Sequence, residues 1–213
     1  MQIRLENICP VFLEQEKINQ SQLWNRLHSF EPGERIQVLA PSGSGKTSFI
    51  HFLYGLRKDF NGSIFYNNKN IQDFTAAETA LLRSSQLSIV FQDLRLFAGH
   101  SVQENIQVKK DLNPYPAALS LAAMAERLGI SNKLQQHAGL CSYGEQQRIA
   151  IIRALQQPFD YLVLDEPFSH LDVANSKKAM ALIEEEVQKR KAGIILADLQ
   201  EVPFFKADRM LNL

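Results

Sequence analysis

Strand-like and helix-like patterns alternate along this chain of 213 residues. Apolar runs at residues 161–164 and 193–196, and the strand-like segment 35–39, are typical of strands that are buried on both faces. Apolar residues at three- and four-residue steps run from Phe49 to Leu56, and a helix is predicted from Ala174 to Arg190. Buried strands that alternate with helices predict an α/β fold with a mostly parallel central sheet.

Other patterns surround these core strands. Ile3, Leu5 and residues 63–66 form short β patterns next to turn signals, which predicts an antiparallel N-terminal β subdomain. From about Thr75 to Gly139 the composition shifts to Ala, Leu, Gln and Glu with helical spacing, so we expect a largely helical insertion. That spacing is illustrated by Leu119, Ala122, Ala123 and Leu128.

Residues 38–48 join the first core strand to its helix and read VLAPSGSGKTS. Gly and Ser let successive backbone N–H groups converge on phosphate oxygens, and the positive end of the helix adds to the attraction. Lys46 can reach the β- and γ-phosphates, and the Thr47 hydroxyl is placed to bind Mg²⁺. Such loops usually open with Gly, but Ala40 adds only a methyl group, so we expect a slightly altered turn. The predicted nucleoside triphosphate site comprises Ser42, Gly43, Ser44, Gly45, Lys46, Thr47 and Ser48.

Two adjacent acids follow the apolar run at residues 161–164. Because neighbouring side chains leave a strand on opposite sides, Asp165 and Glu166 are predicted to have different roles. We expect Asp165 to hold the metal, directly or through water, and Glu166 to orient and deprotonate the water that attacks the γ-phosphate. The alternative is an acidic strand end that faces solvent and has no chemical role.

A second phosphate-seeking helix start is predicted at Ser142, which forms an S-x-x-E capping box with Glu145. It offers a hydroxyl group and a positive helix end ahead of the apolar positions Ile149, Ile152 and Leu155. The chain already has one phosphate loop. The second helix start therefore suggests contact with a nucleotide held by a partner.

The charge balance argues against a nucleic-acid partner. Lys and Arg number 23, as do Asp and Glu, so the formal net charge is zero and no basic field is present. Cys9 and Cys141 lack the spacing of a metal site or a redox pair, which suits a reducing cytosol. No apolar run approaches the roughly 20 residues that span a bilayer, so at a membrane another polypeptide would supply the span.

Five motifs occur in the same order as in one known family. They are the phosphate loop, Phe91-Gln92-Asp93, residues 142–148, Leu164-Asp165-Glu166-Pro167 and Ser169-His170-Leu171-Asp172. Over essentially its whole length the chain resembles the ATP-binding cassette (ABC) ATPases. The resemblance implies a single P-loop NTPase domain, residues 1–213, with a nucleotide-binding core at 1–92 and 155–213. An inserted helical subdomain at 93–154 would carry the signature motif.

The resemblance also implies ATP and Mg²⁺ as ligands and a head-to-tail dimer that encloses two ATP molecules. Gln92 would sense Mg²⁺ and the attacking water. Ser142, Gly144 and Glu145 would belong to the signature motif that faces the partner's nucleotide, with Ser142 and Gly144 touching its γ-phosphate. Phe12 lies where such proteins stack a ring on adenine, with core packing as the alternative. Catalytic roles thus fall to Glu166, Lys46 and Gln92, and metal binding falls to Thr47, Gln92 and Asp165.

Departures from the family pattern concern the γ-phosphate end of the site. Cys141 and Tyr143 replace residues of the usual Leu-Ser-Gly-Gly, and Asp172 would lie at the dimer seam beside them. Ala197 stands where a His that contacts the γ-phosphate is expected. We therefore predict tight ATP binding with slow turnover. His170 could substitute for the missing His, the alternative being an ordinary exposed loop residue.

The leading functional hypothesis is the ATP-binding subunit of an ABC transporter, cytoplasmic and peripheral on the inner face of the cell membrane through transmembrane permease subunits. Leu94, Leu96 and Phe97 form an apolar cluster that is predicted to dock a permease helix or to be subdomain core. The short length resembles the lipoprotein-release, macrolide-export and cell-division branch. The chain would pair with itself or with another ABC ATPase, and a homodimer would lack the His in both sites.

The first alternative is a regulatory or mechanical membrane-associated ATPase, like the cell-division members, that moves no substrate. The missing His favours this reading. A second alternative, a soluble P-loop kinase or a DNA-repair ATPase, is disfavoured by the signature segment, the neutral charge and the absence of a long coiled-coil insertion.

Overall fold

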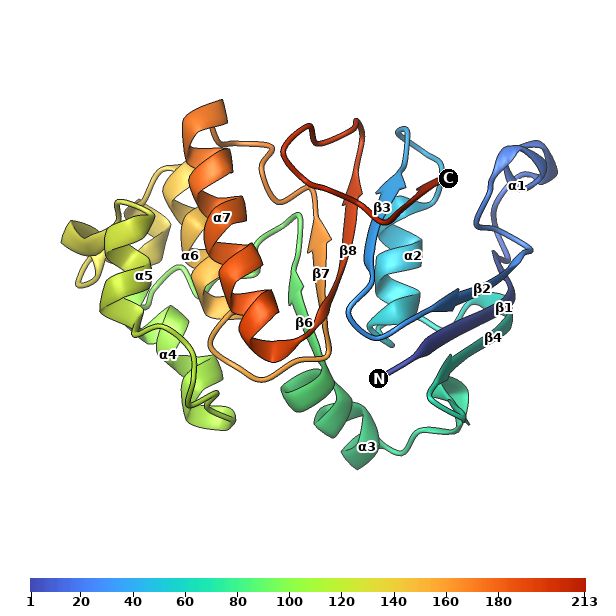
Figure 1. The fold of residues 1–213 in the computed structure, drawn as a ribbon, viewed down its shortest axis with the longest axis horizontal. Coiled ribbons are helices and arrows are strands. Elements are labelled where there is room, and N and C mark those ends of the chain that lie inside the picture. The colour runs from blue at the N-terminus through green and yellow to red at the C-terminus, as the bar shows by residue number, and fades with distance from the viewer.

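The computed structural model describes residues 1–213 and contains two β-sheets flanked by helices (Figure 1). All strand pairs of the five-stranded central sheet are parallel, in the order β6-β7-β8-β3-β9. Its strands are β3 (Arg35–Leu39), β6 (Leu87–Val90), β7 (Tyr161–Asp165), β8 (Gly193–Asp198) and β9 (Arg209–Asn212). The predicted α/β fold with a parallel central sheet is confirmed.

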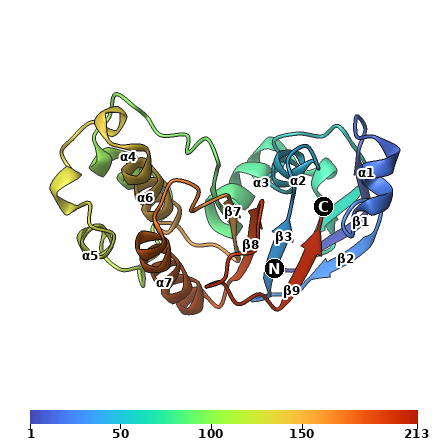
Figure 2. The same ribbon diagram turned by 90° about the horizontal axis from the view of Figure 1, so that it is seen from above.

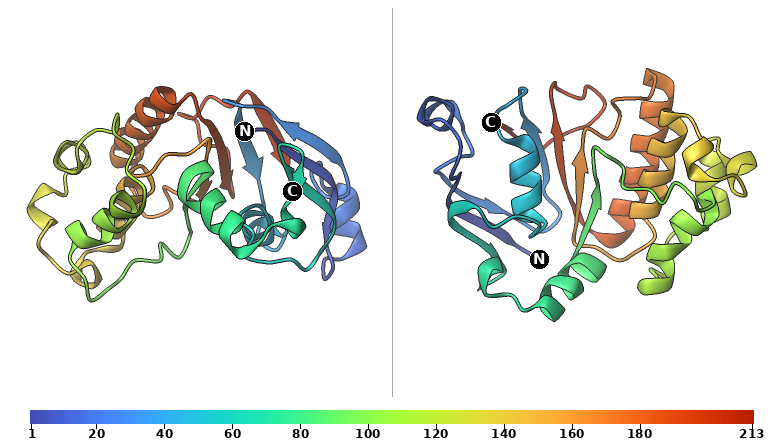
Figure 3. Two further views of the ribbon diagram at one scale, coloured as in Figure 1. Left: turned by 90° about the horizontal axis from the view of Figure 1, so that it is seen from below. Right: turned by 180° about the vertical axis from the view of Figure 1, so that it is seen from behind.

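Helices cover both faces of this sheet. They are α1 (Gln15–Gln20), α2 (Lys46–Leu53), α3 (Ala76–Leu81), α4 (Val102–Leu112), α5 (Leu121–Arg127), α6 (Tyr143–Ala154) and α7 (Val173–Arg190). Figure 3 shows α2 on one side of β6, β7 and β8, with α6 and α7 on the other side. Short 3-10 helices lie at Ile71–Asp73, Ser131–Lys133 and Ala138–Leu140, and a π-helical turn at Leu82–Gln86 leads into β6.

A second, antiparallel sheet has the order β2-β1-β4-β5, as predicted for the N-terminal side. It consists of β1 (Ile3–Pro10), β2 (Leu27–Phe30), β4 (Phe60–Tyr66) and β5 (Lys69–Asn70). Figure 2 shows this sheet at the opposite end of the molecule from α4, α5 and α6. Together with α2 and one face of the central sheet, it encloses a single hydrophobic cluster.

Strict alternation along the central strands explains why they are apolar throughout. Leu162 and Leu164 of β7 pack in the cluster formed with α6 and α7, whereas Tyr161 and Val163 pack in the cluster formed with α2. In β8, Leu196 and Ala197 divide in the same way between the two clusters. Both faces of each strand are therefore buried, which gives the apolar runs that the sequence shows.

The expectation of a largely helical segment from Thr75 to Gly139 is wrong near its start. This segment contains β6, which pairs with β7 and forms one edge of the central sheet. β6 has four buried residues, and its Ser88 hydroxyl donates to the Ala154 carbonyl at 2.7 Å. A strand this short has too few positions to show a period, so the helical composition on either side masked it.

The apolar face predicted around residue 122 is also displaced. In α5 the buried residues are Met124 and Ala125, followed by Leu128, whereas Ala122 is exposed. The proposed boundary at 154/155 follows the end of α6. However, α6 packs in the same hydrophobic cluster as β7, β8 and α7. The division into core and helical subdomain remains a proposal. No helix has both the length and the apolar character needed to cross a membrane.

Candidate active site

The phosphate loop connects β3 to α2 as predicted, and its path depends on two glycines. Gly43 (φ +78°) and Gly45 (φ +99°) lie in the left-handed region, which residues with a side chain rarely adopt. Gly45 is also the N-cap residue of α2, so the first N–H groups of the helix lie next to the loop. Ala40 is fully buried, needs no positive φ and donates its N–H to the Asp198 carbonyl at 2.9 Å. An Ala in place of the usual Gly is therefore accommodated.

One cavity of about 300 Å³ gathers most of the residues predicted to bind nucleotide. Its walls include Phe12, Ser42, Gly43, Gly45, Lys46, Thr47, Ser48, Gln92 and Glu166. Ser44 does not line this cavity, because its side chain is buried and its carbonyl accepts a hydrogen bond from Trp24. A concave site with one buried ammonium group and a helix N-terminus suits a phosphate chain.

Phe12 lies at the rim of this cavity and is 52% exposed. The Arg57 guanidinium lies 4.8 Å from the centre of its ring. The alternative that Phe12 is a core residue is therefore wrong. An exposed ring beside the phosphate loop is available for stacking on a base, which remains a proposal.

Lys46 lies between the two acids at the end of β7. Its Nζ is 2.6 Å from a carboxylate oxygen of Asp165 and 2.6 Å from one of Glu166. All three side chains are buried. Burial disfavours the lysine charge, but hydrogen bonds to the two carboxylates outweigh it and raise the pKa of Lys46. Burial also raises the pKa of Asp165, although Lys46 opposes that shift. One ammonium group is thus shared by two carboxylates.

The prediction that Asp165 and Glu166 point to opposite sides is wrong. β7 ends at Asp165, and Glu166 has a φ of +45°, so strand alternation no longer applies to it. The Glu166 N–H donates to the Ala197 carbonyl at 2.9 Å and holds this turn in place. The turn brings both carboxylates to Lys46, yet Glu166 lines the cavity of the phosphate loop while Asp165 lines the adjoining one. Different roles for the two acids thus remain compatible with the geometry.

The adjoining cavity, about 320 Å³, contains the three residues predicted to bind the metal, Thr47, Gln92 and Asp165. They offer a hydroxyl, an amide carbonyl and a carboxylate, which are the oxygen donors that Mg²⁺ prefers. No cluster of three or more His, Cys, Asp or Glu side chains forms a complete metal site elsewhere. The donor set therefore fits a Mg²⁺ ion whose remaining ligands are phosphate oxygens and water.

The start of α6 has the predicted capping box. The Ser142 N–H donates to Glu145 Oε2 at 2.8 Å, and the Glu145 N–H donates to Ser142 Oγ at 3.3 Å. Ser142 is exposed and lines neither cavity of the phosphate loop. A Cβ on Gly144 would lie 2.8 Å from the His170 carbonyl oxygen, so only Gly fits there. The half-exposed Tyr143 ring packs against the His170 ring with a centroid separation of 4.2 Å and an angle of 60° between the ring planes, and it borders the cavity of Thr47, Gln92 and Asp165.

Gln147 is a site residue that the sequence reasoning missed. It is buried, and its Nε2 donates to the Glu166 carbonyl at 3.0 Å. Its Oε1 accepts the His170 N–H at 3.0 Å. Gln147 therefore ties α6 to the loop that carries Glu166. The only signal in the sequence was an amide side chain just after the capping box. An amide at that position does not by itself specify its hydrogen-bond partner.

Two further predicted residues lie apart from the phosphate loop. Asp172 is the exposed N-cap residue of α7 and accepts the Asn175 N–H at 2.8 Å, a hydrogen bond that lowers the pKa of Asp172. His170 is exposed and lines neither cavity of the phosphate loop. His170 was predicted either to substitute for the missing His or to be an ordinary exposed loop residue. The structure favours the exposed loop residue.

Ala197 stands at the position of the expected His and offers only a methyl group. It belongs to β8, is fully buried and packs in the cluster on the α2 face. The effect of the missing His on turnover stays a prediction. Asp198 ends the strand, is partly exposed and lines neither cavity of the phosphate loop. Burial raises the pKa of Asp198, with Glu166 adding to the rise and Lys46 opposing it.

Trp24, the only tryptophan, supports the phosphate loop from the protein interior and was also missed. Its indole Nε1 donates to the Ser44 carbonyl at 3.0 Å. A Cβ on Gly45 would lie 3.0 Å from the Trp24 ring. The ring makes edge contacts with Phe49 and Phe52 of α2. A lone aromatic residue in a loop region gives no sequence signal for such a contact.

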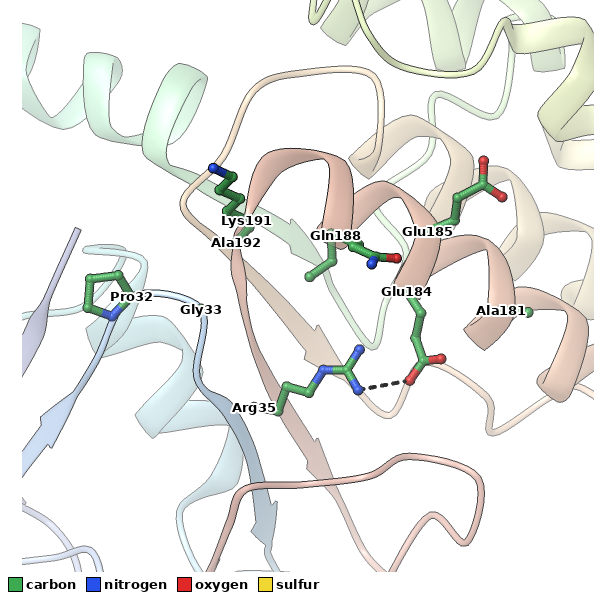
Figure 4. Close-up of a pocket in the computed structure, with 10 residues that line it drawn as sticks. Pro32, Gly33, Arg35, Ala181, Glu184, Glu185, Gln188, Lys191 and Ala192 are labelled. Carbon is green, nitrogen blue, oxygen red and sulfur yellow. Dashed lines mark ion pairs between the residues drawn. The ribbon is translucent and has the colours of Figure 1, made fainter.

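A larger cavity, about 720 Å³, lies at the amino ends of β3 and β8, whereas the phosphate loop lies at the carboxyl end of β3 (Figure 4). Arg35 and Glu184 form an ion pair across it at 3.3 Å. It contains none of the predicted site residues. Ligands of open α/β sheets bind at the carboxyl ends of the strands, which favours the smaller cavities beside the phosphate loop.

Comparisons with known proteins agree with this geometry. An uncharacterised ABC transporter ATP-binding protein of Mycobacterium tuberculosis is 30% identical, over 99% of this chain and 86% of the relative. The lipoprotein-releasing system ATP-binding protein LolD of Coxiella burnetii is 31% identical, over 87% of this chain and 81% of the relative. These relatives are consistent with the branch suggested by the short length.

Solved structures show the same fold. A dimeric ATP-binding cassette with ADP and phosphate bound superimposes with a TM-score of 0.81 at 22% identity, over 99% of this chain and 94% of the other. Residues 25–169 match the sequence model of the family described as ABC transporter. The phosphate loop, the acids that end β7 and the capping box of α6 all lie within this match. This chain therefore belongs to the ABC transporter family, as an ATP-binding subunit.

Proposed function

We propose that this subunit binds ATP and Mg²⁺ at the phosphate loop, hydrolyses ATP slowly, and works as half of an ATPase dimer beneath membrane-embedded permease subunits. The observation that carries the proposal is the buried Lys46 ammonium, held between Asp165 and Glu166 beside a cavity lined by the phosphate loop. A helix N-terminus and a glycine-rich loop on the same cavity wall attract an anion, which a purely structural ion pair would not require.

The residues divide the chemistry among them. Backbone N–H groups of the loop and Lys46 hold the β- and γ-phosphates, while Thr47, Gln92 and Asp165 hold Mg²⁺. Bound Mg²⁺ supplies neutralisation of the phosphate charge. Glu166 lines the cavity of the loop and serves as the base for the attacking water. Because Lys46 contacts Glu166 directly, phosphate binding must draw the ammonium away before Glu166 can accept a proton.

Slow turnover is expected from the residue at the predicted His position near the end of β8. Ala197 has only a methyl group there and cannot donate a hydrogen bond to a phosphate oxygen. Losing one such donor lowers a catalytic rate by roughly 10² to 10³.

Dimerisation gives the start of α6 a purpose. Its N-terminal end is exposed and its capping box is complete, and Ser142 and Gly144 line neither cavity of their own phosphate loop, although Tyr143 borders the adjoining one. We infer that Ser142 and Gly144 face the nucleotide of a second subunit, either an identical copy or another ABC ATPase. Tyr143 and Asp172 are both exposed near this end and would border the seam.

The permease contact is proposed for the segment that follows Gln92. Leu94 is buried, whereas Phe97 and Leu140 are 51% and 74% exposed. A cavity of about 140 Å³ lies here, lined in part by Leu94, Leu96 and Ala138. The Arg153 guanidinium donates to the carbonyls of Leu94 and Arg95, so it connects α6 to this surface. An apolar helix end of a permease subunit would fit here and would place the protein on the inner face of the cell membrane.

A second candidate function is a regulatory ATPase that signals to a membrane protein without moving a substrate. The missing His at Ala197 favours it, because a subunit that closes on ATP and reopens slowly suits signalling better than rapid transport. Co-purification from membranes, followed by mass spectrometry, distinguishes the two candidates. A multi-span permease among the attached proteins supports transport, and a cell-wall hydrolase or its regulator supports signalling.

The proposed chemistry is tested with Trp24 fluorescence and with Glu166→Gln. Because Trp24 contacts the phosphate loop, its emission is expected to change when ATP and Mg²⁺ bind. Glu166→Gln should retain binding, lose hydrolysis by at least about 100-fold and accumulate as a dimer on sizing. Glu201→Gln, an exposed carboxylate change in the loop after β8, is the control. A wild-type protein that shows no saturable response to ATP would contradict the proposal.

A further inference from the structure

The exposed ring of Phe12, at the rim of the phosphate-loop cavity, packs against the side chain of Arg57. The carbon at the centre of the guanidinium lies 4.8 Å from the centre of that ring. The same carbon lies 5.8 Å from the centre of the Phe52 ring, which is fully buried in α2. A guanidinium is attracted to the face of an aromatic ring. Arg57 therefore connects the ring at the cavity rim to a ring of the protein core.

Hydrogen bonds fix where the Arg57 guanidinium lies. Its Nε donates to Asp59 Oδ1 at 2.9 Å and its Nη2 donates to Asp59 Oδ2, so one carboxylate holds it at two points. Its Nη1 donates to Ser48 Oγ at 3.3 Å, and Ser48 lines the cavity of the phosphate loop. The guanidinium that supports the Phe12 ring is thus held in one orientation.

The main chain joins the same two segments. Pro10, at the end of β1, pairs with Phe60 at the start of β4, and the Val11 N–H donates to the Asp59 carbonyl at 3.2 Å. Phe12 is the next residue, in the turn that follows β1. The sheet therefore sets the path of the main chain up to Phe12, and the packing of its ring depends on Arg57.

We infer that Arg57 is a positioning residue for the base of ATP, because its guanidinium holds the Phe12 ring at the cavity rim with one face free for stacking. The inference rests on the proposed function, in which the phosphate loop holds the triphosphate and Phe12 meets the base. Stacking of a base on an aromatic ring tightens binding by roughly 5- to 100-fold. Arg57 controls the share of this gain that depends on the orientation of the ring, about fivefold.

A purely structural role for Arg57 makes a different prediction. Because Arg57 also bonds Ser48 in the first turn of α2, its loss would disturb the phosphate loop in that case. Such a disturbance would weaken every ligand with a triphosphate chain. A positioning role weakens only ligands that carry a base. Inorganic tripolyphosphate has the phosphates without a base, so it separates the two roles.

The test measures affinities of the full chain for ATP and for tripolyphosphate in excess Mg²⁺ by Trp24 fluorescence, since Trp24 contacts the phosphate loop. For Arg57→Ala we expect about fivefold weaker ATP binding and unchanged tripolyphosphate binding. Arg57→Lys keeps a cation beside the ring and should recover part of the loss. Lys58→Ala removes an exposed neighbouring cation and, as the matched control, should keep both affinities.

A double-mutant cycle determines whether Arg57 acts through Phe12. Phe12→Ala should weaken ATP binding by about tenfold and spare tripolyphosphate. In the Phe12→Ala protein, the further change Arg57→Ala should alter the ATP affinity by less than about twofold, because no ring is left to position. Circular dichroism and thermal unfolding check that each variant is folded.

The outcomes separate the inference from the proposed function. The inference is wrong if Arg57→Ala keeps the wild-type ATP affinity, or if it weakens tripolyphosphate binding as much as ATP binding. It is also wrong if Phe12→Ala binds ATP normally, or if Arg57→Ala has its full effect without the Phe12 ring. In each of these cases wild-type binding of ATP leaves the proposed function standing. If the wild-type protein binds neither ATP nor tripolyphosphate, the proposed function itself fails.

Discussion

Two helix starts in this molecule are suited to meet phosphate, and their surroundings differ. At the start of α2, the phosphate loop, Lys46 and the acids that end β7 line adjoining cavities within one chain. At the start of α6, Ser142 is exposed and belongs to neither cavity, although its capping box is complete. Under the proposed function, the first region holds its ligand alone. The second region is preorganised and would meet a ligand brought by another molecule.

The two regions also treat a lysine differently. Lys46 is buried and has two carboxylate partners, which raise its pKa despite burial. Lys109 of α4, in the helical region, is partly buried and is shifted the opposite way, because burial and then the positive charges of Arg153 and Arg83 lower its pKa to about 8. The lysine is paired with carboxylates where phosphate chemistry is proposed and lacks an ion pair where helices pack, and this contrast can be tested.

The largest effect is expected for Lys46→Ala. Without the ammonium, Asp165 and Glu166 remain buried and uncompensated, so the free energy of unfolding at pH 7 should fall by about 3 kcal/mol. ATP binding and hydrolysis should be lost with it. Urea unfolding measures the first effect, and Trp24 fluorescence with ATP measures the second. Lys17→Ala is the matched control, since Lys17 lies next to the loop but is exposed and should change stability by less than about 0.5 kcal/mol. Equal stability of the two variants would show that Lys46 does not hold the acids.

The next effect is expected for Gly144→Ala, which probes the α6 region without touching the phosphate loop. Its Cβ would lie 2.8 Å from the His170 carbonyl oxygen, so α6 or the loop after β7 must shift, at about 2 kcal/mol. ATP binding by the single subunit should persist, because the phosphate loop, Asp165 and Glu166 all lie outside α6, which contributes only Tyr143 to the border of the adjoining cavity. Gly99→Ala is the control, since nothing lies within 4 Å of its Cβ position. Loss of ATP binding in Gly144→Ala would contradict the independence of the two regions.

Local signals in the sequence were enough for the first region. Gly43 and Gly45 are required by backbone angles that are local properties of a phosphate loop, and the capping box at Ser142 is equally local. Contacts between distant segments were not predictable. Trp24 meets Ser44, Gln147 meets Glu166, and neither pair has a spacing rule.

Errors in the sequence predictions arose at the ends of strands. Glu166 was assigned to the wrong side because its φ of +45° breaks the alternation, and β8 extends two residues beyond its apolar run, to Asp198. β6 was hidden in a helical composition because four residues are too few to reveal a period. A strand's interior is defined by burial, whereas its end depends on the turn that follows.

A smaller effect is expected for Ser142→Ala, which compares two identical caps. Loss of the capping hydroxyl should cost about 1 kcal/mol of unfolding free energy. Ser101→Ala removes the same capping box from α4 and should cost a similar amount. Only Ser142→Ala should also lower steady-state hydrolysis at saturating ATP, because only Ser142 is proposed to face the partner's nucleotide. If both variants lower hydrolysis equally, the effect is one of stability, and the proposed role of Ser142 is wrong.

The smallest effect, and the most direct test of the contrast between the two lysines, is the pH dependence of Lys109→Met. The folded pKa of Lys109, about 8, lies below the unfolded value of about 10.4. Between these values the unfolded chain holds a proton that the folded chain has released, so wild-type stability rises with pH across this window. Below pH 8 the folded state carries the full penalty of the buried charge. Lys109→Met removes that penalty and should stabilise the protein at pH 7 by about 0.5 to 1 kcal/mol, with the difference vanishing near pH 10.4. Other groups titrate equally in the wild type and in Lys109→Met. The difference between their free energies of unfolding, measured with urea across this pH range, therefore isolates Lys109. A difference that does not change with pH would show that the Lys109 charge is already balanced in the folded state.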